Sequence, residues 1–468
     1  MKQYTVLIVI LALSPFILWQ IIGLLPTFDD WSYFTNPYHD FGEGLSSLVI
    51  PRDSYWRPFD CIFGHVLSFD KSLFPALNHI MVFLGHLINT FLVWHIARRV
   101  GLALQAVNVS TIFFFLSPAV LGTVLGIDSL NQTYSHLWGM MAIAAYLSSR
   151  RGRHLWLLFA LIATMCKENG MVFFVVPQLM ALAFGKASPR RAAIDTLYPV
   201  LIIIAYFTMR TLMQTDVAEI NAEYLENPVF RIVKNITKFF AATFVVTDYS
   251  LLAYKPMRNF PMAVFIALWL VPFYIYILWQ GRKAIKTRTF LVLLFTIVTA
   301  ASPHLVTLFT SMHSYAALGI VSIALGYLYQ MVAERRRKAA VVLFSLFVVG
   351  AVVVDWHHVE LSRQSGETGR QMALSVLKRI TPCDSISVLY IDLDEDKYSS
   401  FCVIPYDAFG WGAAIRHYGS NGRPRFIDNE IFMPSDSVAI SHYADSIVRE
   451  GFRQVLLVKG DSIDIIRP

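Results

Sequence analysis

Two adjacent carboxylates, Asp29 and Asp30, follow the first long apolar run of the chain by about one helical turn. They stand among aromatic side chains in the stretch LLPTFDDWSYFTNP, residues 24–37. Such carboxylates can be solvated loop charges, but they can also act as a general base or as oxygen ligands of Mg²⁺ or Mn²⁺. Because neighbouring residues of a helix point in different directions, one of the pair can do chemistry while the other caps or orients the loop.

A second group of polar residues lies in the next part of the chain. Arg57 is expected in the first outer loop, and His79, His86 and Asn89 lie on the apolar segment that follows. His79 and His86 share a helix face because they are seven residues apart. Hydrogen bonding between helices explains buried groups such as His86 and Asn89. His79 lies nearer the outer surface, where a substrate could reach it, and two histidines without a third ligand are weak support for zinc.

A third group interrupts nearly continuous apolar sequence in MCKENGMVF, residues 165–173. Lys167 and Glu168 can be a solvated pair at the membrane surface. They can also supply a cation for a phosphate and a carboxylate for a sugar hydroxyl or a metal. Other polar residues expected on the same face are Asp128, Asn131, His304, His313 and Tyr315.

The composition shows what must position these groups. Of 468 residues, 56% are hydrophobic and only 15% are charged, whereas soluble domains carry about 25% charged residues. Long uncharged apolar runs predict membrane-spanning helices, and their continuity argues against a barrel. The first run is too long for a signal peptide core and lacks a cleavage site, so we expect an uncleaved anchor. The net charge of +7 gathers in loops and does not indicate a nucleic-acid partner.

Basic clusters between the apolar runs predict the orientation, because such clusters are retained in the cytoplasm. A path that starts inside needs about eleven spans of roughly 20 residues, some of them shorter. It places Asp29, Asp30 and the C-terminal region outside, and it makes 214–259 an outer loop with an amphipathic or re-entrant helix. The clusters are 97–101, 149–154, 185–191, 281–288 and 334–338, and the predicted spans are 4–25, 75–97, 105–121, 133–148, 155–166, 170–184, 196–213, 260–280, 289–306, 315–333 and 339–355.

From about residue 380 short strand patterns alternate with helical ones, which predicts a small α/β domain. No GxGxxG or GKS/T phosphate loop occurs in it. Cys383 and Cys402 can pair in an oxidising compartment or remain free thiols. The predicted fold is therefore an all-α polytopic membrane bundle with a small C-terminal α/β domain outside the cytoplasm. Its expected parts are the bundle 1–355, with outer loops 26–74 and 214–259, a linker 356–379 and the domain 380–468.

Several short pieces occur in a characteristic order: FDDWSYFTNP, YWRPF, FPALNHIMVFLGHLINTFLVWHI, CKENG, ENPVFRIVKNITKFFAATFVVTDYS and MHSYAALG. This order resembles the GT-C membrane glycosyltransferases, especially the protein O-mannosyltransferase branch and its tetratricopeptide-linked relatives. The resemblance covers roughly residues 1–335. The sequence departs from the family where His313 stands near the Tyr of the last piece in place of an Arg, and where no tetratricopeptide repeats follow the bundle.

The resemblance implies transfer of a sugar from a polyprenyl-phosphate donor to an acceptor hydroxyl on the outer face, with inversion. Asp29 or Asp30 would be the base or the contact to Mg²⁺ or Mn²⁺, and we favour Asp30 slightly. Arg57, Lys167 and His313 would lie on the phosphate side. The other residues expected at the substrate are His79, Glu168 and Tyr315. The acceptor would be a glycan, a lipid or a protein, and the compartment the periplasmic side of a bacterial inner membrane.

Three other functions remain open on the sequence. A transporter or flippase of lipid-linked glycans needs charges near the middle of the membrane, whereas the charges here gather at the outer ends of helices. A polymerase or ligase of the O-antigen type would carry its main catalytic loop late in the chain. A membrane scaffold would tolerate replacement of both Asp29 and Asp30.

Overall fold

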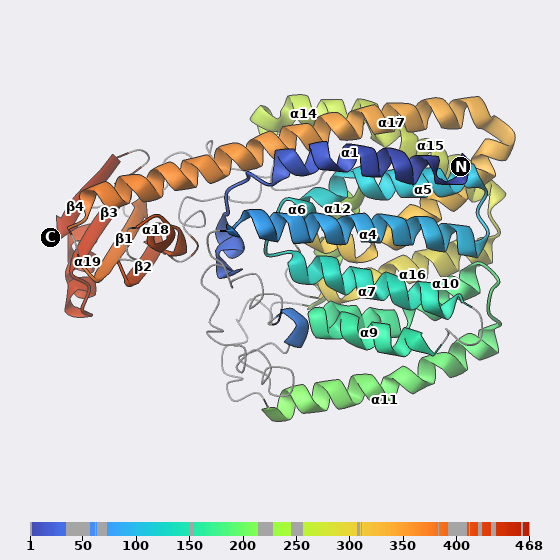
Figure 1. The fold of residues 1–468 in the computed structure, drawn as a ribbon, viewed down its shortest axis with the longest axis horizontal. Coiled ribbons are helices and arrows are strands. Elements are labelled where there is room, and N and C mark those ends of the chain that lie inside the picture. Colours follow the sequence, from blue (N-terminus) through green and yellow to red (C-terminus); the bar gives the residue numbers. More distant parts are fainter. Residues whose placement is uncertain are drawn as a thin grey trace.

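The computed structural model is a bundle of helices with a small sheet at one end (Figure 1). The residues it describes are 2–33, 57–60, 62, 73–148, 154–213, 228–244, 256–306, 309, 311–381, 383–391, 410, 412–419, 424–431, 437–459 and 462–467. The longer bundle helices are α1 (Thr5–Ile21), α4 (Ala76–Val100), α5 (Leu104–Leu116), α7 (Leu130–Tyr146), α9 (Leu155–Cys166), α10 (Val176–Ala183), α11 (Pro189–Met213), α12 (Pro228–Phe244), α14 (Pro256–Trp269), α15 (Val271–Ala284), α16 (Thr287–Leu305) and α17 (Tyr315–Arg379). Shorter helical turns are η1 (Lys2–Tyr4), η2 (Phe28–Tyr33), η4 (Pro118–Val120), α6 (Leu121–Val124), η5 (Glu168–Phe174) and η7 (Ser311–Ser314).

The bundle contains helices of membrane-spanning character, and the predicted count of about eleven spans is not confirmed. Among the described residues five helices are long and apolar enough to cross a membrane, or up to six if α5 and the bent segment Pro118–Val124 form one span. The apolar helices α1 and α9 are shorter. The five are Ala76–Val100, Pro189–Met209, Val264–Ala284, Thr287–Leu305 and Met312–Arg379.

Helix α17 joins two predicted spans and the predicted linker. Its backbone breaks at Arg336, with φ −139° and ψ 48°, inside a basic cluster where the sequence predicts a turn. Beyond the break one helix continues to Arg379, so residues 356–379 are helical, and it runs from the bundle to the sheet (Figure 1). Rings of Phe113 and Phe273 pack on Phe347 of α17, with centroids 5.4 and 5.3 Å apart.

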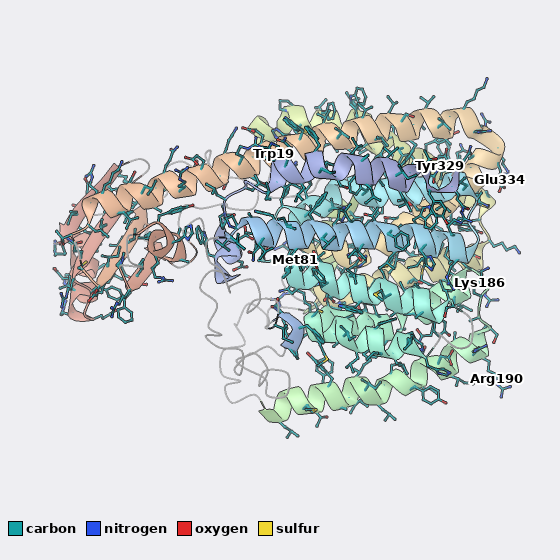
Figure 2. All side chains as sticks on the ribbon, in the orientation of Figure 1. Trp19, Met81, Lys186, Arg190, Tyr329 and Glu334 are labelled. Carbon is teal, nitrogen blue, oxygen red and sulfur yellow. The ribbon has the colours of Figure 1, made fainter. Side chains whose placement is uncertain are left out.

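Two basic segments of the chain lie at the same end of the bundle. Figure 2 shows Lys186, Arg190 and Glu334 together at the end away from the sheet, whereas Trp19 lies toward the other end. Two basic clusters that are far apart in the sequence therefore share one end, as a common cytoplasmic face requires.

The predicted outer loop 214–259 contains α12, and the rest of its residues before 228 and over 245–255 lie outside the described part of the chain. One face of α12 buries Asn235 and Phe239, while Val229 and Phe230 are about 70% exposed. Such an exposed apolar face suits contact with lipid.

The C-terminal residues form the predicted α/β domain. Its strands are β1 (Ser385–Ile391), β2 (Phe426–Ile431), β3 (Gln454–Lys459) and β4 (Ser462–Arg467), and its helices are α18 (Ala413–Tyr418) and α19 (Ser437–Arg449). The sheet order is β2-β1-β3-β4; β1 pairs in parallel with β2 and β3, and β4 is antiparallel to β3. Cys383 is a buried free thiol, and Cys402 lies outside the described residues.

Candidate functional site

Asp30 anchors the turn η2 to the loop that precedes α7. Its Oδ1 accepts hydrogen bonds from the backbone amides of Ile127, at 2.5 Å, and Asp128, at 3.0 Å. Its Oδ2 accepts a third from the amide of Thr27, at 3.3 Å, which closes the turn on itself. The side chain is only 7% exposed. Because backbone amides engage both oxygens, the orientation of Asp30 is set by the fold.

The carboxylates of Asp29, Asp30 and Asp128 lie close enough for their charges to interact. Burial, followed by the charge of Asp128, raises the pKa of Asp30 to about 7. Burial, followed by the charge of Asp29, raises the pKa of Asp128 to about 7, while the charge of Lys167 opposes this. A Cβ on Gly126 would lie 3.0 Å from Asp128 Oδ1 and 3.7 Å from Asp30 Oδ1, so the glycine permits the two carboxylates to approach. At neutral pH the cluster therefore holds protons that ordinary aspartates release.

Lys167 brings a buried cation to the carboxylates. It lies between α9 and η5 with an extended backbone, and it is 8% exposed. A Cβ on Gly170 would lie 2.3 Å from the backbone of Ala163, so only glycine lets the chain fold back so closely on α9. Burial and then the charge of Arg57 lower the pKa of Lys167 to about 8, against the charge of Asp128. Lys167 therefore remains mainly protonated at pH 7.

Arg57 and Glu168 form an ion pair beside Lys167. The Arg57 Nε donates to Glu168 Oε2 at 2.8 Å, and both side chains are largely buried. One turn further along the chain, Asp60 Oδ2 accepts a hydrogen bond of 3.3 Å from Asn131 Nδ2 of α7. The described part of the first outer loop is thus tied to both α7 and η5.

Two histidines close the cationic side. The rings of His304 and His313 stack with centroids 4.0 Å apart and planes 13° apart. Asn169 Nδ2 donates to His304 Nε2 at 2.8 Å and to Gln132 Oε1 at 3.0 Å. The stacked rings and the two hydrogen bonds of Asn169 thus join η7, α16, η5 and α7.

The structure does not bring His79 or Tyr315 into this cluster. His79 is 1% exposed, and its Nε2 lies 3.1 Å from the carbonyl of Leu24. Tyr315 is fully buried, and its hydroxyl lies 3.0 Å from His86 Nδ1 and 3.2 Å from Asn89 Nδ2. The prediction that His86 and Asn89 join helices is confirmed, and Tyr315 and His79 also connect elements of the bundle.

The remaining predicted residues do come together. Asp29, Asp30 and Asp128 form the acidic side, and Arg57, Lys167, Glu168 and His313 form the other. Sequence analysis did not single out Asp60, Gln132 or Asn169. Asn169 directly follows the Lys-Glu pair, which is the one local signal for it; the partners of Asp60 and Gln132 come from distant segments.

The sequence predicts a site for Mg²⁺ or Mn²⁺ at the Asp29 and Asp30 carboxylates. Asp30 accepts amide hydrogen bonds on both of its oxygens. The negative charges of Asp29 and Asp128 interact with each other. Among the described residues no group of three or more His, Cys, Asp or Glu is placed to hold a metal ion. The described side chains alone do not complete a site for Mg²⁺ or Mn²⁺.

Comparison with known proteins identifies the fold. No family model matches the chain, and no curated protein matches it in sequence. The oligosaccharyltransferase of Archaeoglobus fulgidus in complex with Zn and sulfate superposes with a TM-score of 0.51 at 12% identity, over 97% of this chain and 67% of that chain. The chain therefore shares the overall fold of that structure. At 12% identity the likeness concerns the fold alone.

Two further structures of the archaeal enzyme are similar. One, tethered to an acceptor peptide that contains the NVT sequon, gives a TM-score of 0.49 at 13% identity, over 92% of this chain and 64% of that chain. The other, in complex with an inhibitory peptide and a dolichol-phosphate, gives 0.49 at 12% identity, over 97% and 69%. The chain thus spans about two thirds of the length of the archaeal enzyme.

Proposed function

We propose that this protein is a membrane glycosyltransferase that moves a sugar from a polyprenyl-phosphate donor to an acceptor hydroxyl. The observation that carries the proposal is the meeting of Asp128 and Asp29 with the buried Asp30 and Lys167 in a GT-C-like bundle. Charges are costly to bury, so such a group is more often kept for chemistry than for stability. The fold shared with an oligosaccharyltransferase supports the same reaction class.

The carboxylates divide into an anchor and a base. Asp30 is the anchor, because amides of Thr27, Ile127 and Asp128 engage its oxygens. We assign the base to Asp29, whose charge raises the proton affinity of Asp128. This reverses the slight preference for Asp30, because three backbone amides already hold the Asp30 carboxylate in place. Because its pKa is about 7, Asp128 itself can hold a proton at neutral pH.

The reaction then runs as a single displacement. Asp29 accepts the proton of the acceptor hydroxyl while that oxygen bonds to the anomeric carbon. The bond from this carbon to the phosphate oxygen breaks, and the phosphate leaves with the electron pair. Lys167 and Arg57 stabilise its negative charge, and Glu168 orients Arg57 through their 2.8 Å ion pair. Attack opposite the leaving phosphate inverts the anomeric centre.

The proposal also covers the acceptor, the compartment and a divalent metal. The acceptor is a glycan, a lipid or a protein, and the protein O-mannosyltransferase branch offers the most similar order of motifs. The site and the C-terminal domain face the periplasm of a bacterial inner membrane. A divalent metal, Mg²⁺ or Mn²⁺, would be held by Asp29 and Asp128 with ligands from the substrate phosphate.

The test uses cells that lack the native protein, complemented with wild type, Asp29→Asn or Asp128→Asn at matched expression. Mass spectrometry of surface glycans and lipid-linked sugars should show a missing sugar and an accumulated donor in both variants. Asp195→Asn is the control, because Asp195 is also a partly buried carboxylate but bonds to Tyr146 in another part of the bundle, at 2.7 Å. Unchanged glycans in Asp29→Asn cells would remove Asp29 from the chemistry and favour a transporter or scaffold.

A further inference from the structure

Trp31, the residue after Asp30, packs against the C-terminal domain. Its side chain is 1% exposed. Its ring lies 5.4 Å from His417 and 6.1 Å from Tyr418, both on α18, and 5.8 Å from Phe74 at the start of α4. The indole therefore lies between the bundle and a domain that begins some 350 residues later in the chain.

The contact also involves the backbone of the domain. Gly410 has φ +48°, and a Cβ there would lie 2.5 Å from Trp31 Cβ. The main chain before α18 thus lies directly on the indole, where no larger residue fits. Gly412, with φ +80°, faces Ile427 of β2 in the same way and joins this segment to the sheet.

The segment before Trp31 is held on its other sides by the bundle. The carbonyl of Leu24 is bound by His79, and Leu25 lies against Gly366 of α17, where a Cβ would come within 2.9 Å of the Leu25 oxygen. Asp30 is held by the amides of the loop before α7. The C-terminal domain supplies a further contact, at the residue adjoining the carboxylate pair.

We propose that the C-terminal domain is a working part of the transferase site, because through Trp31 it clamps η2 and so positions Asp29 and Asp30. His417, Tyr418 and Gly410 are positioning residues, because they act through Trp31. This inference rests on the proposed function for its effect on catalysis, but the clamp itself does not depend on it. Displacement of a catalytic group by about 1 Å can lower a rate by about 10²-fold.

The test compares two glycines of the same domain in the full-length protein. Gly410→Ala and Gly451→Ala both place a side chain at positive φ, +48° and +104°, but only at Gly410 does the new Cβ meet Trp31, whereas nothing lies within 4 Å at Gly451. Backbone hydrogen exchange of residues 24–33 in detergent micelles should accelerate in Gly410→Ala and not in Gly451→Ala. Equal exchange in both would overturn the clamp.

His417→Ala serves if Gly410→Ala does not fold, because it removes ring contacts without backbone strain. It should also accelerate exchange over 24–33, and Trp31→Phe, which keeps an aromatic ring, should do so less than Trp31→Ala. In complemented cells the ratio of glycosylated product to lipid-linked donor should fall tenfold or more, on the order expected for a displaced catalytic group. Faster exchange with a wild-type ratio would overturn the positioning role, whereas a wild-type ratio in Asp29→Asn cells would instead overturn the proposed function.

Discussion

At the scale of single residues, Asp29 and Asp30 are neighbours in the chain with different surroundings. Asp30 turns inward and accepts hydrogen bonds from three backbone amides, while Asp29 interacts electrostatically with Asp128. The burial that raises the pKa of Asp30 and Asp128 also excludes water, which strengthens every charge interaction at the site. The charges of Asp128 and Lys167 each give a prediction.

The first prediction concerns the stability of the protein as pH changes. The folded-state pKa of Asp128 is about 7, above its usual 3.8, so the folded protein binds more protons than the unfolded chain between these values. The contribution of Asp128 to stability should therefore fall as pH rises from about 4 to 7. Asp128→Asn removes this titration and should reduce the loss by on the order of 2 kcal/mol. Thermal melts in detergent across this pH range measure it; parallel wild-type and variant curves would contradict it.

The second prediction concerns Lys167. Lys167→Met keeps the length of the side chain but removes the charge that we propose stabilises the leaving phosphate. We expect transfer to fall by about 10²- to 10³-fold, the loss typical of one group that stabilises developing charge. Lys186→Met, at the end of the bundle away from the sheet (Figure 2), is the matched control and should leave transfer intact. The ratio of product to lipid-linked donor measures both variants, and equal ratios would count against a phosphate-side role for Lys167.

At the scale of elements, short turns rather than long helices place the reactive groups. Asp30 lies in η2, Lys167 at the junction of α9 and η5, and His313 in η7. The long helices fix where these turns begin and end, and α4, α7 and α9 pack side by side in that order (Figure 1). A loop can present a side chain that a helix surface would bury against its neighbours.

The tight turn at Gly170 provides the prediction at this scale. A Cβ there would lie 2.3 Å from the backbone of Ala163, so Gly170→Ala must push η5 away from α9. We expect destabilisation of about 1–3 kcal/mol, as for overpacking in a core, together with loss of transfer, because Lys167 and Glu168 move with the turn. Gly23→Ala is the control, since nothing lies within 4 Å of its added Cβ. Thermal shift assays that fail to separate the two variants would refute the close packing.

At the scale of the whole molecule, basic residues and the α/β domain lie at opposite ends of the bundle. Lys186 and Arg190 lie at one end (Figure 2), and the sheet lies beyond the other (Figure 1). Helix α17 connects the ends, because after its break at Arg336 it runs through to Arg379 beside the sheet. A lipid-linked substrate has its phosphate at the membrane surface, so a site at a bundle end meets it without entering the hydrocarbon.

The prediction at this scale concerns which side of the membrane each end of the bundle faces. Single cysteines at Arg190 and at Glu334, in a chain whose own cysteines are replaced by serine, should react with a membrane-impermeant maleimide only after the cells are opened. A cysteine at the exposed Asp464 of β4 should react in cells whose outer barrier alone is permeable. Basic loops are retained in the cytoplasm, which is the physical reason for the difference. Labelling of Arg190 and Asp464 positions from the same side would contradict it.

The sequence by itself determined the character of the elements, because the signals for them are local. Runs of apolar residues predict α4, α11 and α16, the basic cluster 334–338 predicts the break in α17, and alternating patterns after residue 380 predict β1, β2 and β3. The adjacency of Asp29 and Asp30, and of Lys167 and Glu168, is also visible in the letters.

Only the tertiary structure decided which of these groups meet and what each one does. The amides that bind Asp30 come from residues 97 and 98 positions away, and the ring of His417 that covers Trp31 comes from another domain. The burial of His79 and Tyr315 follows from the packing of several helices, not from their spacing on one. Roles such as anchor, base and cation depend on desolvation and on distances between distant segments, and these exist only once the chain has folded.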